Sequence, residues 1–199
     1  MSSEIIPFPT KRYNIILADP PWHFSSGIRS SKKIGAKFQY YTPDTTIGNG
    51  KYATMADEEI KSLPVATILD RDAAIFLWTT DAHLPIAIEV LSDWGAPYKT
   101  IAFIWNKKER SGKQVCYYGK WTMKGSEICL LGTKGRAHSF IKSHKVRQLI
   151  EAPRDRNLHS KKPAIVRDKI VELLGDLPRI ELFARERVEG WDAWGDEVG

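Results

Sequence analysis

The chain has 199 residues, 42% of them hydrophobic, and its 30 Lys and Arg residues exceed its 24 Asp and Glu residues, giving a net charge of +6. This predicts one domain over residues 1–199 and favours a polyanionic partner. No apolar run approaches the roughly 20 residues that span a bilayer. With two cysteines and no signal-peptide pattern, we expect an intracellular, cytoplasmic protein without a membrane segment. Its Cys and His residues lack metal-ligand spacing, so no metal site is predicted.

The first predicted element is a buried strand over residues 15–18, followed by Asp19-Pro20-Pro21-Trp22. The two prolines remove backbone donors and fix φ, so the strand ends there. Asp19 is therefore expected at the carboxyl edge of a sheet, where open α/β sheets bind ligands. Taken alone, the tetrapeptide is also compatible with an ordinary turn followed by a core tryptophan.

The same tetrapeptide resembles the active site of an amino-methyltransferase. The lone pair of a ring amine is delocalised, and two acceptors that bind its N–H groups would localise it and stabilise positive charge on nitrogen. The Asp19 carboxylate and the Pro20 carbonyl fit those roles, with Pro21 making the turn rigid. Trp22 offers a flat face on which a flipped base could stack.

A long Ser-, Gly- and Lys-containing stretch over about residues 23–51 follows. We expect an active-site and substrate-binding loop, in which Lys32, Lys33 and Lys37 contact nucleic acid; a floppy insertion with a solvated surface is the alternative. Thr54 is then expected to cap a helix over residues 58–63 that ends near Pro64.

Buried strands and amphipathic helices alternate over the rest of the chain, which is typical of an α/β fold with a mostly parallel sheet flanked by helices. Asp81 is expected to cap one helix, which Gly95 ends; Gly175 ends another. The predicted strands cover residues 73–78, 100–105, 127–131 and 180–183, and the predicted helices cover residues 84–91 and 165–174.

Nine segments occur in the order and approximate spacing of the MT-A methyltransferase family, which is named for the seventy-kilodalton catalytic subunit of the eukaryotic mRNA adenosine methyltransferase. The resemblance covers about residues 13–197. The segments are Asp19-Pro20-Pro21-Trp22, Tyr52-Ala53-Thr54-Met55, Phe76-Leu77-Trp78, Phe103-Ile104-Trp105-Asn106-Lys107, Gly119-Lys120-Trp121, Glu127 to Gly135, Ser160-Lys161-Lys162-Pro163, Glu181 to Arg185 and Gly190 to Gly195.

The resemblance implies a class I Rossmann-like methyltransferase fold that uses S-adenosylmethionine and methylates the 6-amino group of adenine in DNA or RNA. It also implies a permuted order, with the catalytic motif before the cofactor motif. No GxGxxG pattern occurs in the chain, so the residues alone would not have indicated this cofactor.

Cofactor-binding residues are carried over from the matching motifs. Glu181 resembles the acidic residue that binds the ribose hydroxyls, and Phe183 and Arg185 belong to the same motif. Lys162 resembles a lysine between the cofactor and substrate pockets, and Asp19 borders both. A plain ion pair between Glu181 and Arg185, and a solvated Lys162, are the structural alternatives.

The family's Gly-Asn-Gln-like segment, which meets the cofactor adenine, is matched here by Gly195-Asp196-Glu197. Asp196 and Glu197 are carboxylates in place of amides, so they can accept a hydrogen bond from an amine but cannot donate one to a ring nitrogen. They are assigned to the cofactor with that difference.

On the substrate side, the resemblance assigns Tyr52 and Glu127, and we add Trp105, which ends a predicted strand near the catalytic edge. Packing in the core is the alternative role for Trp105 and for Trp78. We expect Trp121, Trp191 and Trp194 to be structural.

DNA is the favoured substrate, because the compact chain resembles bacterial and bacteriophage members that modify DNA. RNA is the alternative within the same enzyme class. A non-catalytic nucleic-acid-binding partner subunit and a small-molecule methyltransferase are alternatives from other classes. Whether the protein is a homodimer or needs a partner subunit stays open.

Overall fold

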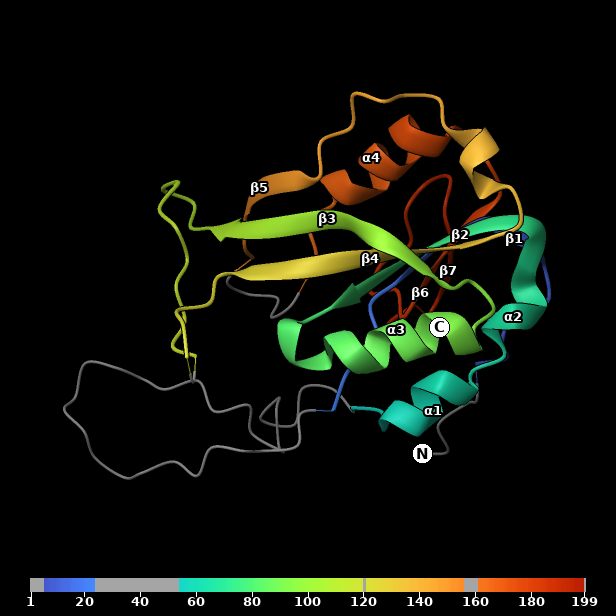
Figure 1. The fold of residues 1–199 in the computed structure, drawn as a ribbon, viewed down its shortest axis with the longest axis horizontal. Helices are drawn as coiled ribbons and strands as arrows, with labels where there is room; N and C mark the ends of the chain where they lie inside the picture. Colours follow the sequence, from blue (N-terminus) through green and yellow to red (C-terminus); the bar gives the residue numbers. More distant parts are fainter. Residues whose placement is uncertain (1–5, 24–53, 120, 156–160, 199) are drawn as a thin grey trace.

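The core of the protein is a seven-stranded sheet with the strand order β5-β3-β4-β2-β1-β6-β7 (Figure 1). The computed structural model describes residues 6–23, 54–119, 121–155 and 161–198. The strands are β1 (Tyr13–Ala18), β2 (Leu69–Thr79), β3 (Tyr98–Lys108), β4 (Ser126–Lys134), β5 (Leu149–Pro153), β6 (Arg179–Leu182) and β7 (Asp192–Trp194).

The sheet is mostly parallel. Strand β1 pairs in parallel with β2 and β6, and the pairs β6–β7 and β3–β5 are also parallel. Strand β4 runs antiparallel to both of its neighbours, β2 and β3. The carboxyl ends of β1, β2, β3 and β6 therefore lie at the same edge of the sheet, which is where ligands bind in open α/β folds.

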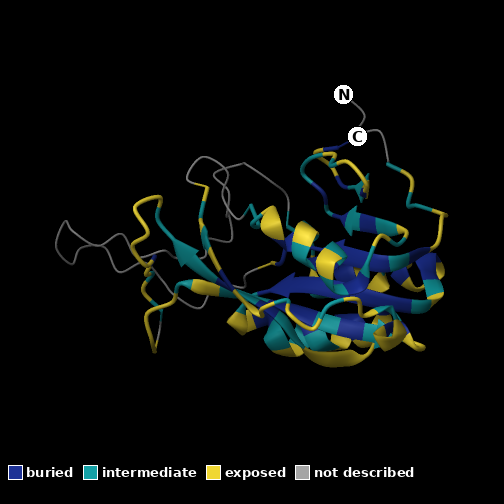
Figure 2. Cartoon of the chain, turned by 90° about the horizontal axis from the view of Figure 1, so that it is seen from above, coloured by how far each residue is buried: buried dark blue, intermediate teal, exposed yellow. Residues whose placement is uncertain are grey.

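Helices cover both faces of the sheet (Figure 1). One face packs against α1 (Asp57–Ser62), α2 (Val65–Ile68) and α3 (Leu84–Asp93), and the other packs against α4 (Ile165–Leu174). Two short 3₁₀ helices, η1 (Asp81–His83) and η2 (Ala137–Phe140), complete the described elements. Figure 2 shows the resulting burial: the central strands β1 and β2 are mostly buried, whereas the outer strands and the outer surfaces of the helices are partly exposed.

Side-chain alternation decides which residues meet which helix. In β1, Ile16 and Ala18 pack on the face of α1 and α3, while Ile15 and Leu17 pack on the face of α4. Residues that pair across parallel strands share a face, so Glu181, which is opposite Leu17, also points toward α4. This places the expected cofactor residue on the side of the sheet that the start of α4 covers.

The predicted α/β class and mostly parallel sheet are confirmed, but two predicted helix caps are wrong. Helix α1 is capped at Ala56, whose backbone N–H is bound by Glu59 Oε2 at 2.8 Å, and not at Thr54. Asp81 lies inside η1, and its carboxylate pairs with Lys124 instead of capping α3. At α1, Glu59 thus supplies the side-chain acceptor that local sequence had assigned to Thr54.

Glycine ends α4 as expected. Gly175 has φ 89° and ψ −179°, a backbone conformation that is essentially restricted to glycine. The longest described helices, α3 and α4, have ten residues each, and no helix in the described parts of the chain could cross a membrane. Of the expected loop over about residues 23–51, only His23 is among the described residues. Lys32, Lys33, Lys37 and Tyr52 lie outside them.

Candidate active site

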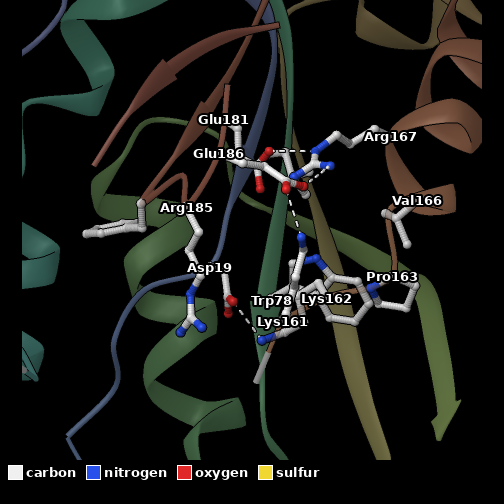
Figure 3. A pocket seen from close by; sticks show the side chains of 12 residues that line it. Asp19, Trp78, Lys161, Lys162, Pro163, Val166, Arg167, Glu181, Arg185 and Glu186 are labelled. Atoms are coloured by element: carbon white, nitrogen blue, oxygen red, sulfur yellow. Dashed lines mark hydrogen bonds and ion pairs between the residues drawn. The ribbon is translucent and has the colours of Figure 1, made fainter. Parts of the chain in front are cut away.

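A cavity opens at the carboxyl edge of the sheet, where β1 and β6 end beside the start of α4 (Figure 3). It encloses about 430 Å³, a volume that includes the part open to solvent. The lining side chains include the predicted residues Asp19, Lys162, Glu181, Phe183 and Arg185. The folded chain thus brings together residues that are up to 166 positions apart in sequence.

The turn after β1 is held by backbone hydrogen bonds. The Trp22 N–H donates to the Pro20 carbonyl at 2.9 Å, and the Met55 N–H donates to the Pro21 carbonyl at 2.9 Å. A carbonyl oxygen has two lone pairs, so the Pro20 carbonyl can accept a second hydrogen bond. These contacts fix the backbone on which Asp19 is presented.

Trp22 lies in the core and not on the cavity wall. Its side chain is 6% exposed, its indole N–H donates to the Trp78 carbonyl at 3.0 Å, and its ring stacks on His83 at 5.5 Å between centroids. The expected stacking of a base on Trp22 does not fit this burial. Trp22 instead anchors the turn to the end of β2.

Asp19 belongs to a buried chain of four alternating charges. Lys162 Nζ lies 2.7 Å from Asp19 Oδ2 and 3.1 Å from Glu127 Oε2, and the other Glu127 oxygen pairs with Lys107. The four side chains are 11% to 21% exposed. Two carboxylates and two ammonium groups balance in charge, which is how charged groups are tolerated away from water.

The two carboxylates have opposite pKa shifts. Burial raises the pKa of Asp19, and attraction to Lys162 offsets this only in part. Burial also acts to raise the pKa of Glu127, but Lys162 and Lys107 together outweigh it, and the pKa of Glu127 is lowered. Although burial disfavours the charged form of Lys162, Asp19 and Glu127 raise its pKa, so it stays a cation. Of the two carboxylates, Asp19 is therefore the more readily protonated.

Glu181 is held by a residue that the sequence did not single out. Arg167, in the first turn of α4, donates from Nε to Glu181 Oε2 at 2.7 Å and pairs with Glu186, which also binds Lys161 (Figure 3). A cation is unfavourable in the first turn of a helix, where the macrodipole is positive. Its presence there was a signal of a specific acidic partner.

Lys107 is a second missed partner. Lys107 is on β3 at the same spacing as the buried Phe103 and Trp105, and its side chain is 14% exposed. Alternation along a strand puts residues 103, 105 and 107 on one face. The period-two pattern could thus have identified Lys107 as an inward-facing lysine.

The chain turns sharply after β6 at Phe183. Phe183 has φ 60°, a left-handed conformation that is unusual for a bulky residue, and its ring contacts Trp194 edge-on at 5.6 Å. This turn directs Arg185 back toward Asp19 along the cavity wall (Figure 3). Backbone held in such a conformation often marks a binding site.

The carboxyl-terminal pair lies outside the cavity lining. Asp196 and Glu197 are both exposed, and Glu197 Oε1 is 3.4 Å from Arg185 Nε. The structure therefore links Glu197 to the site through Arg185. For Asp196, an adenine contact stays a prediction.

Four further tryptophans differ in how far they are buried. Trp105 is 2% exposed and donates its indole N–H to the Ala152 carbonyl, so it packs in the core and cannot contact a base as expected. Trp191 is buried and Trp194 packs against Phe8 and Phe183. Trp121 is 91% exposed, so its predicted structural role is wrong.

Trp78 lines the cavity and carries a buried indole N–H without a hydrogen-bond partner. Buried donors are almost always satisfied, so this one indicates an acceptor missing from the cavity wall. In the described residues, no group of three or more His, Cys, Asp or Glu side chains could hold a metal ion.

The sheet order, the flanking helices and the cavity at the ends of β1 and β6 define a Rossmann-like methyltransferase fold, with the Asp19 motif preceding the Glu181 motif in the chain. The profile of the MT-A70 family matches residues 13–197. The chain therefore belongs to the MT-A70 family of methyltransferases.

Several relatives are similar over nearly the whole chain. The Type II methyltransferase M.MunI of Mycoplasma sp is 34% identical over 98% of this chain and 82% of its own length. The N6-methyladenosine RNA methyltransferase MTA1 of Pyricularia oryzae is 30% identical over 94% of this chain but 47% of its own length. The N(6)-adenine-specific methyltransferase METTL4 of Mus musculus is 26% identical over 94% of this chain and 38% of its own length.

Proposed function

We propose that this protein transfers a methyl group from S-adenosylmethionine to the exocyclic 6-amino group of adenine in DNA. The observation that carries the proposal is the position of Asp19: it directly follows β1 at the carboxyl edge of the sheet and lines the same cavity as Glu181. In this arrangement an acceptor for the substrate amine is beside residues suited to the cofactor.

Asp19 would act on the substrate through hydrogen bonding and charge. Lys162 binds Oδ2, which orients the carboxylate so that Oδ1 can accept an N–H of the adenine amine. The Pro20 carbonyl would accept the second N–H. Together they would localise the nitrogen lone pair and stabilise the positive charge that develops on nitrogen.

The cavity residues fit S-adenosylmethionine in their chemistry. Glu181 is a carboxylate that can accept hydrogen bonds from two ribose hydroxyls while Arg167 holds its Oε2. The unpartnered Trp78 N–H supplies a donor in the same wall. When bound, the cofactor supplies a methyl group already activated by a positively charged sulfur. Because the donor is activated, positioning by the chain accounts for much of the expected rate.

DNA is favoured over RNA by sequence similarity. The Mycoplasma Type II methyltransferase is 34% identical to this chain, and the relative that is named as an RNA methyltransferase is 30% identical. RNA is the second candidate, since that relative is nevertheless 30% identical over 194 residues.

The substrate can be decided by incubating the protein with labelled S-adenosylmethionine and matched DNA and RNA, each single- and double-stranded. The methylated nucleoside is identified by mass spectrometry. We expect N6-methyldeoxyadenosine. Label found only in RNA would replace the proposed substrate by the second candidate, and label on neither nucleic acid would contradict the proposal for this chain acting alone.

A further inference from the structure

The segment between β3 and β4, residues 109–125, is described except for Lys120, and its described part forms an arm that projects beyond the carboxyl end of β3 (Figure 1). Its base is well anchored. The Val115 N–H donates to the Lys107 carbonyl at 3.0 Å, and the backbones of Tyr117 and Lys124 exchange hydrogen bonds at 2.6 and 2.8 Å. The Tyr117 hydroxyl also accepts from Arg154 at 2.7 Å. These hydrogen bonds hold the arm in a defined position relative to β3.

Three large apolar side chains are exposed near the tip. Trp121 is 91% exposed, Met123 is 54% exposed and Tyr118 is 43% exposed. The other six tryptophans are all buried or half-buried. Leaving such side chains in water forgoes roughly 25 cal/mol for each Å² that could be buried, so a group of them indicates a binding surface.

The charge of the arm indicates what binds there. Residues 109–125 contain four Lys and Arg residues and one Glu, and one of the four, Lys124, pairs with Asp81. The single acid, Glu109, is paired with Arg154 at 2.7 Å. Lys113 and Arg110 are exposed. A strongly positive surface with an exposed aromatic ring is the combination by which proteins hold single-stranded nucleic acid.

The arm is attached close to the candidate active site. Lys107 ends β3 at its base and pairs with Glu127, which Lys162 connects to Asp19. Because β3 is parallel to β1 in the sheet, the arm leaves from the same edge that presents Asp19. A strand bound along the arm would therefore run next to the cavity.

We propose that the arm of residues 109–125 holds a single-stranded segment of the nucleic acid, with Trp121 stacked on a base beside the target adenine and the arm's cations on the phosphates. The position relative to the target rests on the proposed function, whereas binding of the strand does not. A second copy of this chain is the competing occupant of the apolar tip. It is disfavoured because two arms of the same positive charge would repel each other.

The test measures binding of a fluorescently labelled 12-nucleotide single-stranded DNA by anisotropy, without cofactor. We expect Trp121→Ala to weaken binding about 10-fold, within the range of one lost base stack, and Trp121→Phe to retain most of the affinity. Tyr98→Ala is the matched control, because Tyr98 is an exposed aromatic residue at the opposite end of β3; it should leave binding unchanged. An abasic strand should bind equally to wild type and Trp121→Ala.

Intrinsic fluorescence gives a second readout, since Trp121 is far more exposed than any other tryptophan. Binding of the strand should quench its emission, and this quenching should be absent in Trp121→Phe. Equal affinity of wild type and Trp121→Ala for the strand would overturn the proposal. So would a dimer of the wild type that Trp121→Ala converts to a monomer in sedimentation, because it would assign the tip to a second copy.

The test separates the two proposals. Loss of strand binding in Trp121→Ala, in a protein that transfers no methyl group, would support the arm and contradict the proposed function. Methyl transfer to DNA with no effect of Trp121→Ala on strand binding would support the function and contradict the arm.

Discussion

Lys162 lies between two carboxylates, Asp19 and Glu127, whose pKa values shift in opposite directions. It binds both Asp19 and Glu127, but Glu127 has a second cation in Lys107, while Asp19 has the repulsion of Glu127 added to its burial. The net effect is that burial raises the pKa of Asp19, whereas the two lysines lower the pKa of Glu127. Asp19, which we propose accepts a hydrogen bond from the substrate, is thus the carboxylate that depends most on Lys162 to stay ionised.

Replacing Lys162 with methionine should make activity more sensitive to acid. The pKa of Asp19 is already raised by burial, and loss of the Lys162 charge raises it further. Since the ionised carboxylate is the active form, activity falls as the pH drops through this pKa, and the acid limb of the kcat profile should shift to higher pH.

The matched control is Lys99→Met, which removes an exposed lysine at the opposite end of β3. Its pH profile should coincide with that of the wild type. An acid limb that stays in place in Lys162→Met, or moves to lower pH, would exclude Lys162 as the group that keeps Asp19 ionised.

At the scale of elements, Glu127 joins three parts of the chain. It is on β4 and pairs with Lys107 on β3 and with Lys162 in the segment that precedes α4. Breaking a buried charge pair from one side leaves the other charges without compensation. The contribution of Glu127 to stability should therefore exceed that of an exposed ion pair.

Replacing Glu127 with glutamine should lower the free energy of unfolding at neutral pH by about 3 kcal/mol. The pKa of Glu127 is lowered in the folded protein, so its ionised form stabilises the fold above the unfolded value of about 4.3. This advantage is lost as the pH falls through the folded pKa. Urea titrations of both proteins between neutral and acidic pH measure the difference.

Glu151→Gln is the control for this experiment. Glu151 pairs with Lys108 on neighbouring strands, but its side chain is 56% exposed, and exposed pairs contribute little. A Glu127→Gln protein as stable as Glu151→Gln at neutral pH would contradict a structural role for the buried chain of charges.

The elements were predictable to different degrees. Apolar runs such as residues 15–18 and 73–78 identified β1 and β2, because a run buried on both faces is visible locally. The antiparallel direction of β4 and the short strand β5 were not predicted, since both depend on which distant strand they pair with. The cap at Ala56 was missed because Glu59, and not the capping residue itself, supplies the side-chain acceptor.

The site residues that belong to sequence motifs were predictable, whereas those that join the site only through contacts with distant residues were not. Asp19, Lys162 and Glu181 were named from the sequence and line one cavity. Arg167, which binds Glu181, and Lys107, which binds Glu127, were missed, because these pairs form only after distant segments meet. Trp22 was expected to offer its ring to a base but is buried, and Trp121 was expected to be structural but is exposed. Residue type alone does not determine whether a tryptophan is buried.

At the scale of the whole molecule, the cavity is assembled by the sheet. Strands β1 and β6 are neighbours in space although 161 positions separate Ala18, at the end of β1, from Arg179, at the start of β6, and α4 closes the cavity from one face. A ligand that bridges these elements would bind only the folded state. It should therefore stabilise the entire protein.

Saturating S-adenosylmethionine, at 100 times its Kd, should stabilise the folded protein by about 3 kcal/mol. Glu181→Ala should abolish most of the corresponding rise in Tm, because the Glu181 carboxylate is the expected ribose ligand. Glu189→Ala, which removes an exposed acid after β6, should keep the full rise. Equal rises in Glu181→Ala and wild type, measured by thermal unfolding, would remove Glu181 from the cofactor site.

The most direct measurement is methyl transfer to adenine-containing DNA by wild type and Asp19→Ala, with the product nucleoside identified by mass spectrometry and cofactor binding measured by calorimetry. We predict N6-methyldeoxyadenosine from the wild type, and no turnover from Asp19→Ala although it still binds S-adenosylmethionine. Near wild-type turnover by Asp19→Ala would contradict the assignment of Asp19 as the residue that holds the substrate amine.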